Sequence, residues 1–353
     1  MIEKDYAEDV LTKLLATWSG PDADMRAILD VASAEIAAIG LEPAVNEELK
    51  AVSAHHGHGG VLFNGHLDTV PAGQGWTRKL GDREGTLIYG RGTADMKGGV
   101  AAILAAAREL KAKEVPFSLL FTTDEETTMN AAAKLQGTGF VRKAAAVVVG
   151  EPTDLAIVGS EKGILWFEVT TRGRSAHGSM PHLGDNAILK MMKLLAAFEP
   201  YTRPKDHLAE VTVNVGAIDG GSKTNVVADL CAVDLDVRYP PHLTREDAKR
   251  FVEATTRVVG VPADVEILHE VPAARVNENS NHIRKMKELA GPDVRAVSYG
   301  TEMAYYAQVN PRCLVLGPGK PEMAHVPDER VDLAQVVKAA EIYAKYAEAL
   351  GPM

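Results

Sequence analysis

The sequence predicts an α/β protein, with a mostly parallel sheet interrupted by an inserted α+β unit. Three short apolar runs predict buried strands, and helical segments separate them, as in a parallel sheet. At 353 residues the chain is too long for one ordinary core, so two domains are expected. The residue pattern changes near residue 162. We therefore predict one domain from residues 1–161 and 272–353 and an inserted domain at 162–271.

The first elements along the chain are two helices, predicted over residues 5–17 and 24–39, where apolar residues recur at helical spacing. Gly40 follows the second helix as a natural terminator. A strand is predicted near 43–53. The glycine-rich turn at 54–60 then favours a solvated hairpin tip. Its three histidines are also compatible with metal binding, but no carboxylate stands beside them.

The three buried strands begin at Val61, Phe117 and Ala145, and each is followed by ligand-type side chains. Ligands of parallel α/β sheets bind beyond the carboxyl ends of the strands, so these side chains are expected to meet. A glycine-rich turn around Asp95 precedes a helix predicted from Val100 to Ala112. An aspartate at a helix start is ordinarily an N-cap, which would explain Asp95 without any metal.

The inserted domain is predicted to combine strands with two helices, and the chain then returns to the first domain. The predicted strands of the insertion are 164–171, 210–218 and 226–237, and its helices are 185–199 and 244–258. The elements predicted after it are a helix at 279–289, a strand at 312–316 and a helix at 332–350.

Composition and charge exclude several classes of partner. Hydrophobic residues make up 46% of the chain and charged ones 24%, a globular balance. The net charge of −10 argues against nucleic acid or an anionic membrane as the main partner. Cys231 and Cys313 form no CxxC motif, so neither a disulfide framework nor a thiolate zinc site is supported. The first residues do not resemble a signal peptide, and a cytoplasmic protein is expected.

The side chains expected at the carboxyl edge of the sheet are two imidazoles and several carboxylates. His66 could bind a metal through one ring nitrogen, while Asp68 receives the other N–H or supports the site through another hydrogen bond. So many carboxylates would repel one another unless cations compensated them. Two divalent ions are the natural compensation, with zinc favoured and cobalt or manganese chemically admissible. The gathered residues are His66, Asp68, Asp95, Glu125, Glu126, Glu151 and the late His325.

Six motifs follow one another in an order that resembles a known family of di-zinc amidohydrolases and exopeptidases. That family includes acetylornithine deacetylase, succinyl-diaminopimelate desuccinylase, lysine-releasing deacylases, glutamate carboxypeptidase and aminoacylase. The resemblance covers nearly the whole chain, and six ordered motifs are far more specific than any one of them. They are Gly65-His66-Leu67-Asp68, Gly90-Arg91-Gly92 with Asp95-Met96-Lys97-Gly98, Asp124-Glu125-Glu126, Gly150-Glu151-Pro152-Thr153, Arg174-Ser175-Ala176-His177 and the segment around His325.

The resemblance implies two Zn²⁺ ions per chain and a role for each ligand-type residue. Asp95 would bridge the ions, with His66 and Glu151 on one ion and Glu126 and His325 on the other. Glu125 would be the general base and acid for a metal-bridged water, and Asp68 the catalytic partner of His66.

The resemblance also implies that the inserted domain is a lid through which two chains form a homodimer. His177 would then stabilise the oxyanion across the dimer interface, although its residue pattern alone also fits a surface histidine. Asn225 and Arg238 would bind polar and carboxylate groups of the substrate, whereas Arg238 alone equally suits a strand-end salt bridge. Thr301 and Gly317 are the remaining substrate-binding residues that the resemblance suggests.

The leading functional expectation is hydrolysis of the amide of a small N-acyl amino acid, such as acetylornithine or a related acyl-ornithine or acyl-lysine, in arginine or lysine biosynthesis. Succinyl-diaminopimelate desuccinylase or a di- or tripeptidase of the same family is the alternative. A non-catalytic protein that binds metal or carboxylate is the alternative from another class, and the presence of Glu125 disfavours it.

Overall fold

The computed structural model describes residues 2–352, which divide into two compact units. Unit 1 comprises the residues up to Gly159, Val276–Arg295 and the residues from Thr301 onward, and unit 2 comprises Ser160–Arg275 and Ala296–Gly300. The sequence-based borders at 161/162 and 271/272 compare with 159/160 and 275/276 in the structure. The return of Ala296–Gly300 to unit 2 was not predicted.

Unit 1 is built on a sheet whose centre is parallel and whose edges are antiparallel. The neighbours β6–β3, β3–β7 and β7–β15 run parallel, while β1–β2, β2–β6 and β15–β8 run antiparallel. This confirms the predicted α/β class. In sheet order the strands are β1 (Ala44–Asn46), β2 (Ala51–His56), β6 (Phe117–Thr122), β3 (Val61–His66), β7 (Val147–Val149), β15 (Cys313–Val315), β8 (Ile157–Glu161) and β13 (Ala274–Arg275), with β14 (Val294–Val297) beside β8.

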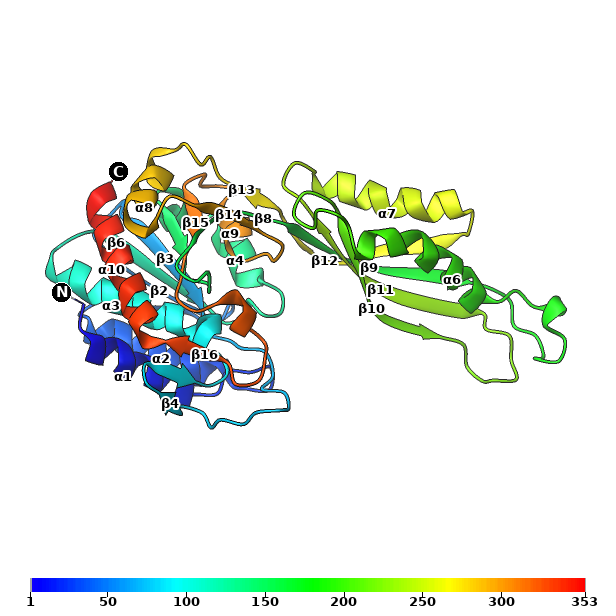
Figure 1. Cartoon of the computed structure of the whole chain (residues 1–353), viewed down its shortest axis with the longest axis horizontal. Coiled ribbons are helices and arrows are strands. Elements are labelled where there is room, and N and C mark those ends of the chain that lie inside the picture. Colours follow the sequence, from blue (N-terminus) through cyan, green and yellow to red (C-terminus); the bar gives the residue numbers. More distant parts are fainter. Residues whose placement is uncertain (1, 353) are drawn as a thin grey trace. The chain divides into compact units, whose positions relative to one another are not determined.

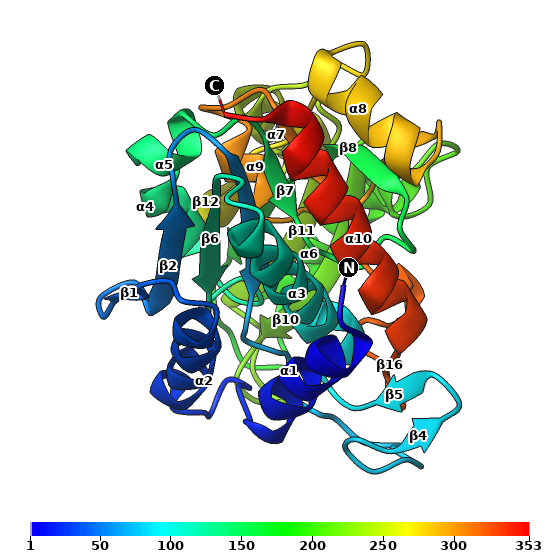
Figure 2. The same ribbon diagram turned by 90° about the vertical axis from the view of Figure 1, so that its left-hand side faces the viewer.

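Helices cover this sheet, and a small second sheet lies beside it. Figure 2 shows α3 and α10 crossing one face of the large sheet, where they pack on each other and α1 packs against both. The helices are α1 (Lys4–Ala16), α2 (Met25–Ala38), α3 (Gly98–Ala112), α4 (Asn130–Leu135), α5 (Gly139–Arg142), α8 (Asn281–Ala290), α9 (Met303–Tyr306) and α10 (Leu333–Leu350). The small sheet contains β16 (Arg330–Asp332), β5 (Leu87–Tyr89) and β4 (Arg83–Glu84), and the short helical turns are η1 (Thr93–Lys97) and η4 (Pro321–Met323).

Unit 2 is an antiparallel four-stranded sheet with two helices on one face. Figure 1 shows α6 and α7 over the strands, and the core contains residues such as Leu165, Phe167 and Val237 from the covered face. A capping box between Thr244 and Asp247 begins α7. The sheet order is β10 (Thr212–Gly220), β11 (Leu230–Tyr239), β9 (Gly163–Arg172) and β12 (Ala263–Val271), and the helical elements are η2 (Pro181–Leu183), α6 (Ala187–Phe198), η3 (Glu199–Thr202) and α7 (Arg245–Val259).

The strand predicted at 43–53 is divided in two, and the hairpin tip predicted after it is wrong. The segment forms two short strands that pair with each other, β1 and β2. Strand β2 does not pair with β3, because β6 lies between them. The turn at 57–60 therefore crosses the start of β6, where a Cβ on Gly60 would lie 1.9 Å from the carbonyl oxygen of Pro116. Strands β8, β12, β13 and β14 were not predicted.

Within residues 2–352, no helix combines the length and the apolar character that a membrane crossing requires.

Candidate metal centre

The predicted ligands converge because three adjacent parallel strands end at the same edge of the sheet. His66 is the last residue of β3. Strand β6 leads into Glu125 and Glu126, and β7 leads into Glu151. Asp95 comes from η1, just before α3, and His325 comes from the loop after η4. Residues from five distant segments thus form one cluster.

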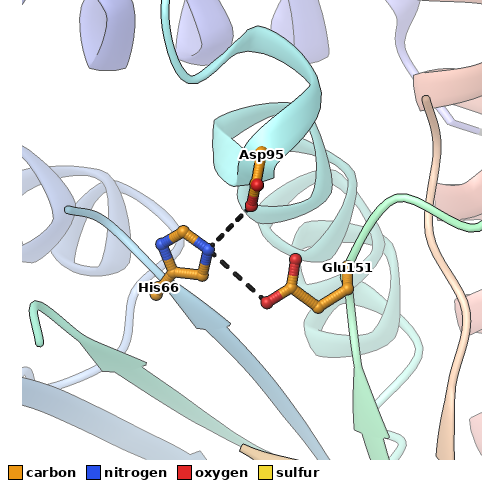
Figure 3. Close-up of side chains that lie close together, drawn as sticks. All are labelled: His66, Asp95 and Glu151. Atoms are coloured by element: carbon orange, nitrogen blue, oxygen red, sulfur yellow. Dashed lines mark hydrogen bonds and ion pairs between the residues drawn. The ribbon is translucent and has the colours of Figure 1, made fainter. Parts of the chain in front are cut away.

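The first candidate ligand group contains His66, Asp95 and Glu151, as Figure 3 shows. The Nε2 atom of His66 lies 3.0 Å from Oδ1 of Asp95 and 3.5 Å from Oε1 of Glu151. All three side chains are almost completely shielded from solvent. One ligand atom from each residue lies within 4.8 Å of the others, which is close enough for one ion to contact all three.

The second candidate ligand group shares Asp95 with the first and adds Glu126 and His325. The Nε2 atom of His325 lies 3.2 Å from Oδ2 of Asp95 and 3.1 Å from Oε2 of Glu126. Asp95 therefore directs one carboxylate oxygen toward each histidine. His325 is half exposed, so this side of the cluster is the open one.

The electrostatics of the cluster fit a cation site. Burial favours a neutral Asp95, but hydrogen bonds from His325 and His66 outweigh it and hold the pKa of this carboxyl below its usual range. The partners Asp95 and Glu126 raise the pKa of His325 to about 10. Burial would lower the pKa of His66, but Glu151, Asp68 and Asp95 raise it. Protons on the imidazoles thus balance the carboxylates, a role that divalent ions would assume on binding.

The donor set fits zinc, since each group offers one imidazole nitrogen and carboxylate oxygens. His66 and Glu151 would hold one ion, Glu126 and His325 the other, with Asp95 between them.

Asp68 supports the site, although by a different route from the first one predicted. The Nδ1 atom of His66 lies 2.9 Å from the backbone carbonyl oxygen of Asp68, whereas the carboxylate is 3.5 Å away. The carboxylate instead accepts hydrogen bonds from the backbone N–H groups of Glu125 at 3.3 Å and Glu126 at 3.1 Å. A proton on Nδ1 of His66 leaves Nε2 available for a metal.

Glu125 and Asp124 differ from their neighbour Glu126 in their contacts. Burial, together with the charge of Glu151, raises the pKa of the Glu125 carboxyl. Glu125 belongs to neither candidate ligand group. Asp124 accepts a hydrogen bond from the N–H of Ala131 at 3.0 Å in the first turn of α4, so it acts as a structural cap. The three adjacent acids therefore differ in role: Asp124 caps α4, Glu126 is a candidate ligand, and Glu125 is buried beside the ligand groups.

Glu329 anchors the turn that carries Asp95, a role that was missed from sequence. One of its oxygens accepts from Nη1 of Arg91 at 2.5 Å and the N–H of Gly92 at 3.0 Å. The other accepts from the N–H groups of Ala94 at 2.9 Å and Asp95 at 3.1 Å. Glu329 is fully buried. Its only local signal was its position four residues after His325.

Thr301 and Gly317 belong to unit 1, and each has a close contact with the backbone of that unit. The hydroxyl of Thr301 accepts from the N–H of Met303 at 3.1 Å, at the start of α9. A Cβ on Gly317 would lie 2.2 Å from the carbonyl oxygen of Gly150 and 2.5 Å from that of Glu151. The absence of a side chain at Gly317 thus lets the segment after β15 pack directly against the backbone of Glu151. The substrate contact of Gly317 stays a prediction.

In unit 2, His177 and Asn225 lie on adjoining exposed segments. The N–H of Gly178 donates to the carbonyl oxygen of Asn225 at 2.8 Å, and His177 bridges to Val226. The hydroxyl of Ser179 lies 2.7 Å from Nδ1 of His177. The exposed side chains of His177 and Asn225 do not belong to the hydrophobic core of unit 2.

Arg238 is held by an acid that was not predicted. Its Nε and Nη2 atoms donate to the two carboxylate oxygens of Asp236 at 2.7 Å and 2.8 Å. Both residues lie on the face of the sheet away from α6 and α7, two positions apart on β11. The predicted salt bridge and substrate contact are compatible, because this geometry leaves the Nη1–Nη2 edge of the guanidinium for a second anion.

Two ligand groups that share an aspartate at the carboxyl edge of a parallel sheet are the arrangement that two-metal hydrolases use. Residues 62–349 match the family described as Peptidase family M20/M25/M40. The chain belongs to this family, which confirms the resemblance drawn from the six motifs.

Relatives of known activity share a third of their residues with the chain. The acetylornithine deacetylase of Proteus mirabilis is 34% identical over 311 residues, which cover 83% of this chain and 80% of the relative. The acetylornithine deacetylase of Vibrio vulnificus is 34% identical over 353 residues, with 91% of this chain and 92% of the relative covered. These relatives and the family establish a metal-dependent amidohydrolase.

Solved structures of the same fold span nearly the whole chain. A tripeptidase from Staphylococcus aureus aligns with a TM-score of 0.81 at 19% identity and 99% coverage of both chains. An M20 metallo-carboxypeptidase from Sulfolobus solfataricus has the same TM-score at 18% identity, also with 99% of both chains covered. A dinuclear metal-binding M20 peptidase from Bacillus subtilis aligns with a TM-score of 0.71 at 15% identity, covering 98% of both chains.

Replacing Glu329 by glutamine tests its role as the anchor of the Asp95 turn. The amide places an NH₂ group opposite N–H donors and leaves Arg91 without its buried counter-charge. We expect the metal-free variant to lose about 3 kcal/mol of unfolding free energy in urea titrations, the scale for breaking a buried ion pair. Zinc affinity should fall as well.

Glu322→Gln is the matched control, because Glu322 is an exposed acid in η4, seven residues before Glu329. It should leave the unfolding free energy and the zinc affinity unchanged. A Glu329→Gln variant as stable as the Glu322→Gln control would contradict the anchoring role.

Proposed function

We propose that the protein hydrolyses the amide bond of an N-acyl amino acid, namely acetylornithine or a related acyl-ornithine or acyl-lysine. The observation that carries the proposal is the pair of ligand groups joined by Asp95, with Glu125 next to them but in neither group. The named activity of relatives at 34–36% identity supports acetylornithine as the first substrate to test. A place in arginine or lysine biosynthesis would follow from such a substrate.

Glu125 is the residue that we propose to move protons. When bound, two zinc ions would polarise the substrate carbonyl and acidify a water molecule between the ligand groups. Glu125 would take the proton of the attacking water and then deliver it to the leaving amine nitrogen. The backbone hydrogen bonds from Glu125 and Glu126 to Asp68 hold this pair of acids against the strand end. Cobalt or manganese would suit the same ligands.

A di- or tripeptidase, or a succinyl-diaminopimelate desuccinylase, is the alternative function. Such enzymes would use the same ligand groups, and peptidases occur among the solved structures of this fold. We expect zinc- or cobalt-loaded protein to turn over acetylornithine faster than succinyl-diaminopimelate or a series of dipeptides. A higher kcat/KM for the dipeptides would replace the proposal by the peptidase function. No turnover of any of them would favour a non-catalytic role.

Glutamine substitutions of the adjacent acids should have different effects. Glu125→Gln should keep two metal ions per chain in elemental analysis and lower kcat by about 10²-fold or more, the usual contribution of a general acid–base group. Glu126→Gln removes a ligand and should lower the metal content. Near-normal turnover of metal-replete Glu125→Gln would refute its role, and an unchanged metal content in Glu126→Gln would refute the ligand assignment.

Arg238 is proposed to bind the α-carboxylate of the substrate. Asp236 fixes the guanidinium through Nε and Nη2, so the remaining edge is already oriented when the substrate arrives. Lys162 places a second cation near Arg238, since burial and the charge of Arg238 together lower the pKa of Lys162 to about 8. The free edge can offer two parallel N–H groups to one carboxylate.

Arg238→Lys keeps the charge but removes the planar fork. We expect kcat/KM for a substrate with a free α-carboxylate to fall by about tenfold or more, the value of a charged hydrogen bond. The same substrate with an amidated carboxyl group should be much less affected. Arg172→Lys is the matched control, since Arg172 also pairs with an aspartate, Asp264, on this sheet. Equal losses for both substrates would remove Arg238 from carboxylate binding.

A homodimer through unit 2 is proposed from its exposed apolar side chains and its free sheet edge. Among the described strands, β10 pairs only with β11, so its other edge can accept a partner. Leu189 and Met192 project from α6 with 57% and 59% exposure, and Ile218 on β10 is 54% exposed. Such apolar surface favours association, and a two-fold dimer would bury it on both chains.

His177 is proposed to act as an oxyanion donor in the active site of the partner chain. His177→Ala alone should lower kcat by about 10² to 10³-fold, as for loss of one oxyanion donor. Mixing His177→Ala with Glu125→Ala and allowing subunit exchange should restore activity. One site of each heterodimer would regain both side chains. A mixture as inactive as its parents would show that His177 does not act in trans.

A further inference from the structure

Glu302 is a buried acid that the proposed chemistry does not use. It directly precedes α9, and its side chain is only 1% exposed. The Nδ2 atom of Asn64 donates to Oε2 of Glu302 at 2.8 Å and lies 3.2 Å from the hydroxyl oxygen of Tyr306. Asn64 and Tyr306 are completely buried. Burying an acid among neutral partners is unfavourable, so its presence at this position calls for a structural or functional reason.

The contacts of Glu302 lead directly to the strands that carry the metal ligands. Asn64 lies on β3, two residues before His66, and its Nδ2 also donates to the carbonyl oxygen of Leu120 on β6 at 3.2 Å. The backbone carbonyl oxygen of Asn64 accepts the N–H of Gly150, the residue before Glu151. The side chain of Asn64 thus joins β3 to β6 and to α9, and its backbone joins β3 to the end of β7.

A further neighbour extends the network toward Glu125 and Glu126. Thr122, the last residue of β6, pairs in register with His66, and its hydroxyl lowers the pKa of the Glu302 carboxyl. The Tyr306 hydroxyl, from α9, accepts from the same Nδ2 group of Asn64 that donates to this carboxyl. The network therefore ties α9 to the two strand ends from which the chain enters the metal centre.

The charge state of Glu302 suits a hydrogen-bonding link. Burial raises the pKa of the Glu302 carboxyl to about 8, against smaller opposing effects of Asn64 and Thr122. The carboxyl is therefore neutral at pH 7, and glutamine is its close isostere. A buried network of this kind is rigid when each member has its partners, and it becomes unfavourable when one acceptor is removed.

We propose that Glu302 is a positioning residue of the metal centre, whose carboxyl links α9 to the ends of β3 and β6 and so fixes the directions of His66, Glu125 and Glu126. Outer partners of this kind typically change metal affinity by about 10 to 100-fold when they are lost. The inference rests on the metal-dependent activity of the protein, and it is independent of which acyl amino acid is the substrate.

The test compares zinc affinity in two variants of Glu302 and one control variant. The affinity is measured by competition with a chelator, without substrate. Glu302→Leu removes the acceptor of Asn64 and should weaken zinc binding by about 10-fold or more. Glu302→Gln keeps an acceptor and should retain affinity within a few-fold of the parent. The visible absorption of the cobalt-loaded protein should change in the leucine variant and not in the glutamine variant.

Asn310→Leu is the matched control for general loss of stability. Asn310 is also buried, and its Nδ2 donates to the carbonyl oxygens of Val141 and Ala144, before the amino end of β7. It should lower the unfolding free energy without altering zinc affinity or the cobalt spectrum. If Glu302→Leu does not fold, Tyr306→Phe tests the same network with a smaller lesion and should still weaken zinc binding.

Parent-like zinc affinity in Glu302→Leu, or in Tyr306→Phe if it replaces that variant, would overturn the proposal. So would an equal loss in Asn310→Leu, which would reduce the effect to general destabilisation. A loss in Glu302→Gln as large as in Glu302→Leu would overturn the hydrogen-bonding link. Because no substrate is present, failure of the acetylornithine proposal would leave these results unaffected.

Discussion

The mutual repulsion of carboxylates at one sheet edge is the constraint on which the rest of unit 1 depends. Asp95, Glu126 and Glu151 face two histidines within two ligand groups, and Glu125 stands beside them. Like charges at these separations spread apart unless the chain holds them and cations balance them. The parallel strands hold the carboxylates in place, because their carboxyl ends lie at one edge of the sheet. Ligands that are far apart in the sequence are thereby brought together. Bound cations would therefore stabilise the cluster, whereas the carboxylates repel one another when nothing balances their charge.

Support for the ligands comes from acids that themselves contact no metal position. Asp68 receives the backbone of Glu125 and Glu126, and Glu329 receives the backbone of the Asp95 turn. Glu302 links the strand ends from below through Asn64. Each is buried and accepts directional hydrogen bonds, so each limits how far a ligand can move when charge is added or removed. Buried acids lower stability unless their partners are in place, which makes this frame sensitive to single substitutions.

The sequence revealed ligand positions better than it revealed the contacts between them. His66, Glu126 and Glu151 follow apolar strands directly, so their shared edge could be inferred from local pattern and the rules of parallel sheets. The partner of Asp68 depended on where the chain turns after β6. The roles of Glu329 and Glu302 depended on pairings across more than 200 residues. Strand β12 was missed because the apolar Leu268 lies on its exposed face and the polar His269 on its covered face, which breaks the alternation of residue types although burial alternates throughout.

Because the metal ligands lie in unit 1 and the residue proposed to bind the substrate carboxylate lies in unit 2, the proposal has a consequence for specificity. Unit 1 holds the metal groups in a frame that relatives with deacetylase and peptidase activities share as a fold. Arg238 and its orienting partner Asp236 lie on the open face of a different sheet, where replacing a side chain leaves the apolar core beneath untouched. If Arg238 binds the substrate as proposed, substitutions on that face would change which carboxylate is recognised without disturbing the buried acids around Asp95. Substrate preference should therefore vary more freely within this family than the metal ligands do.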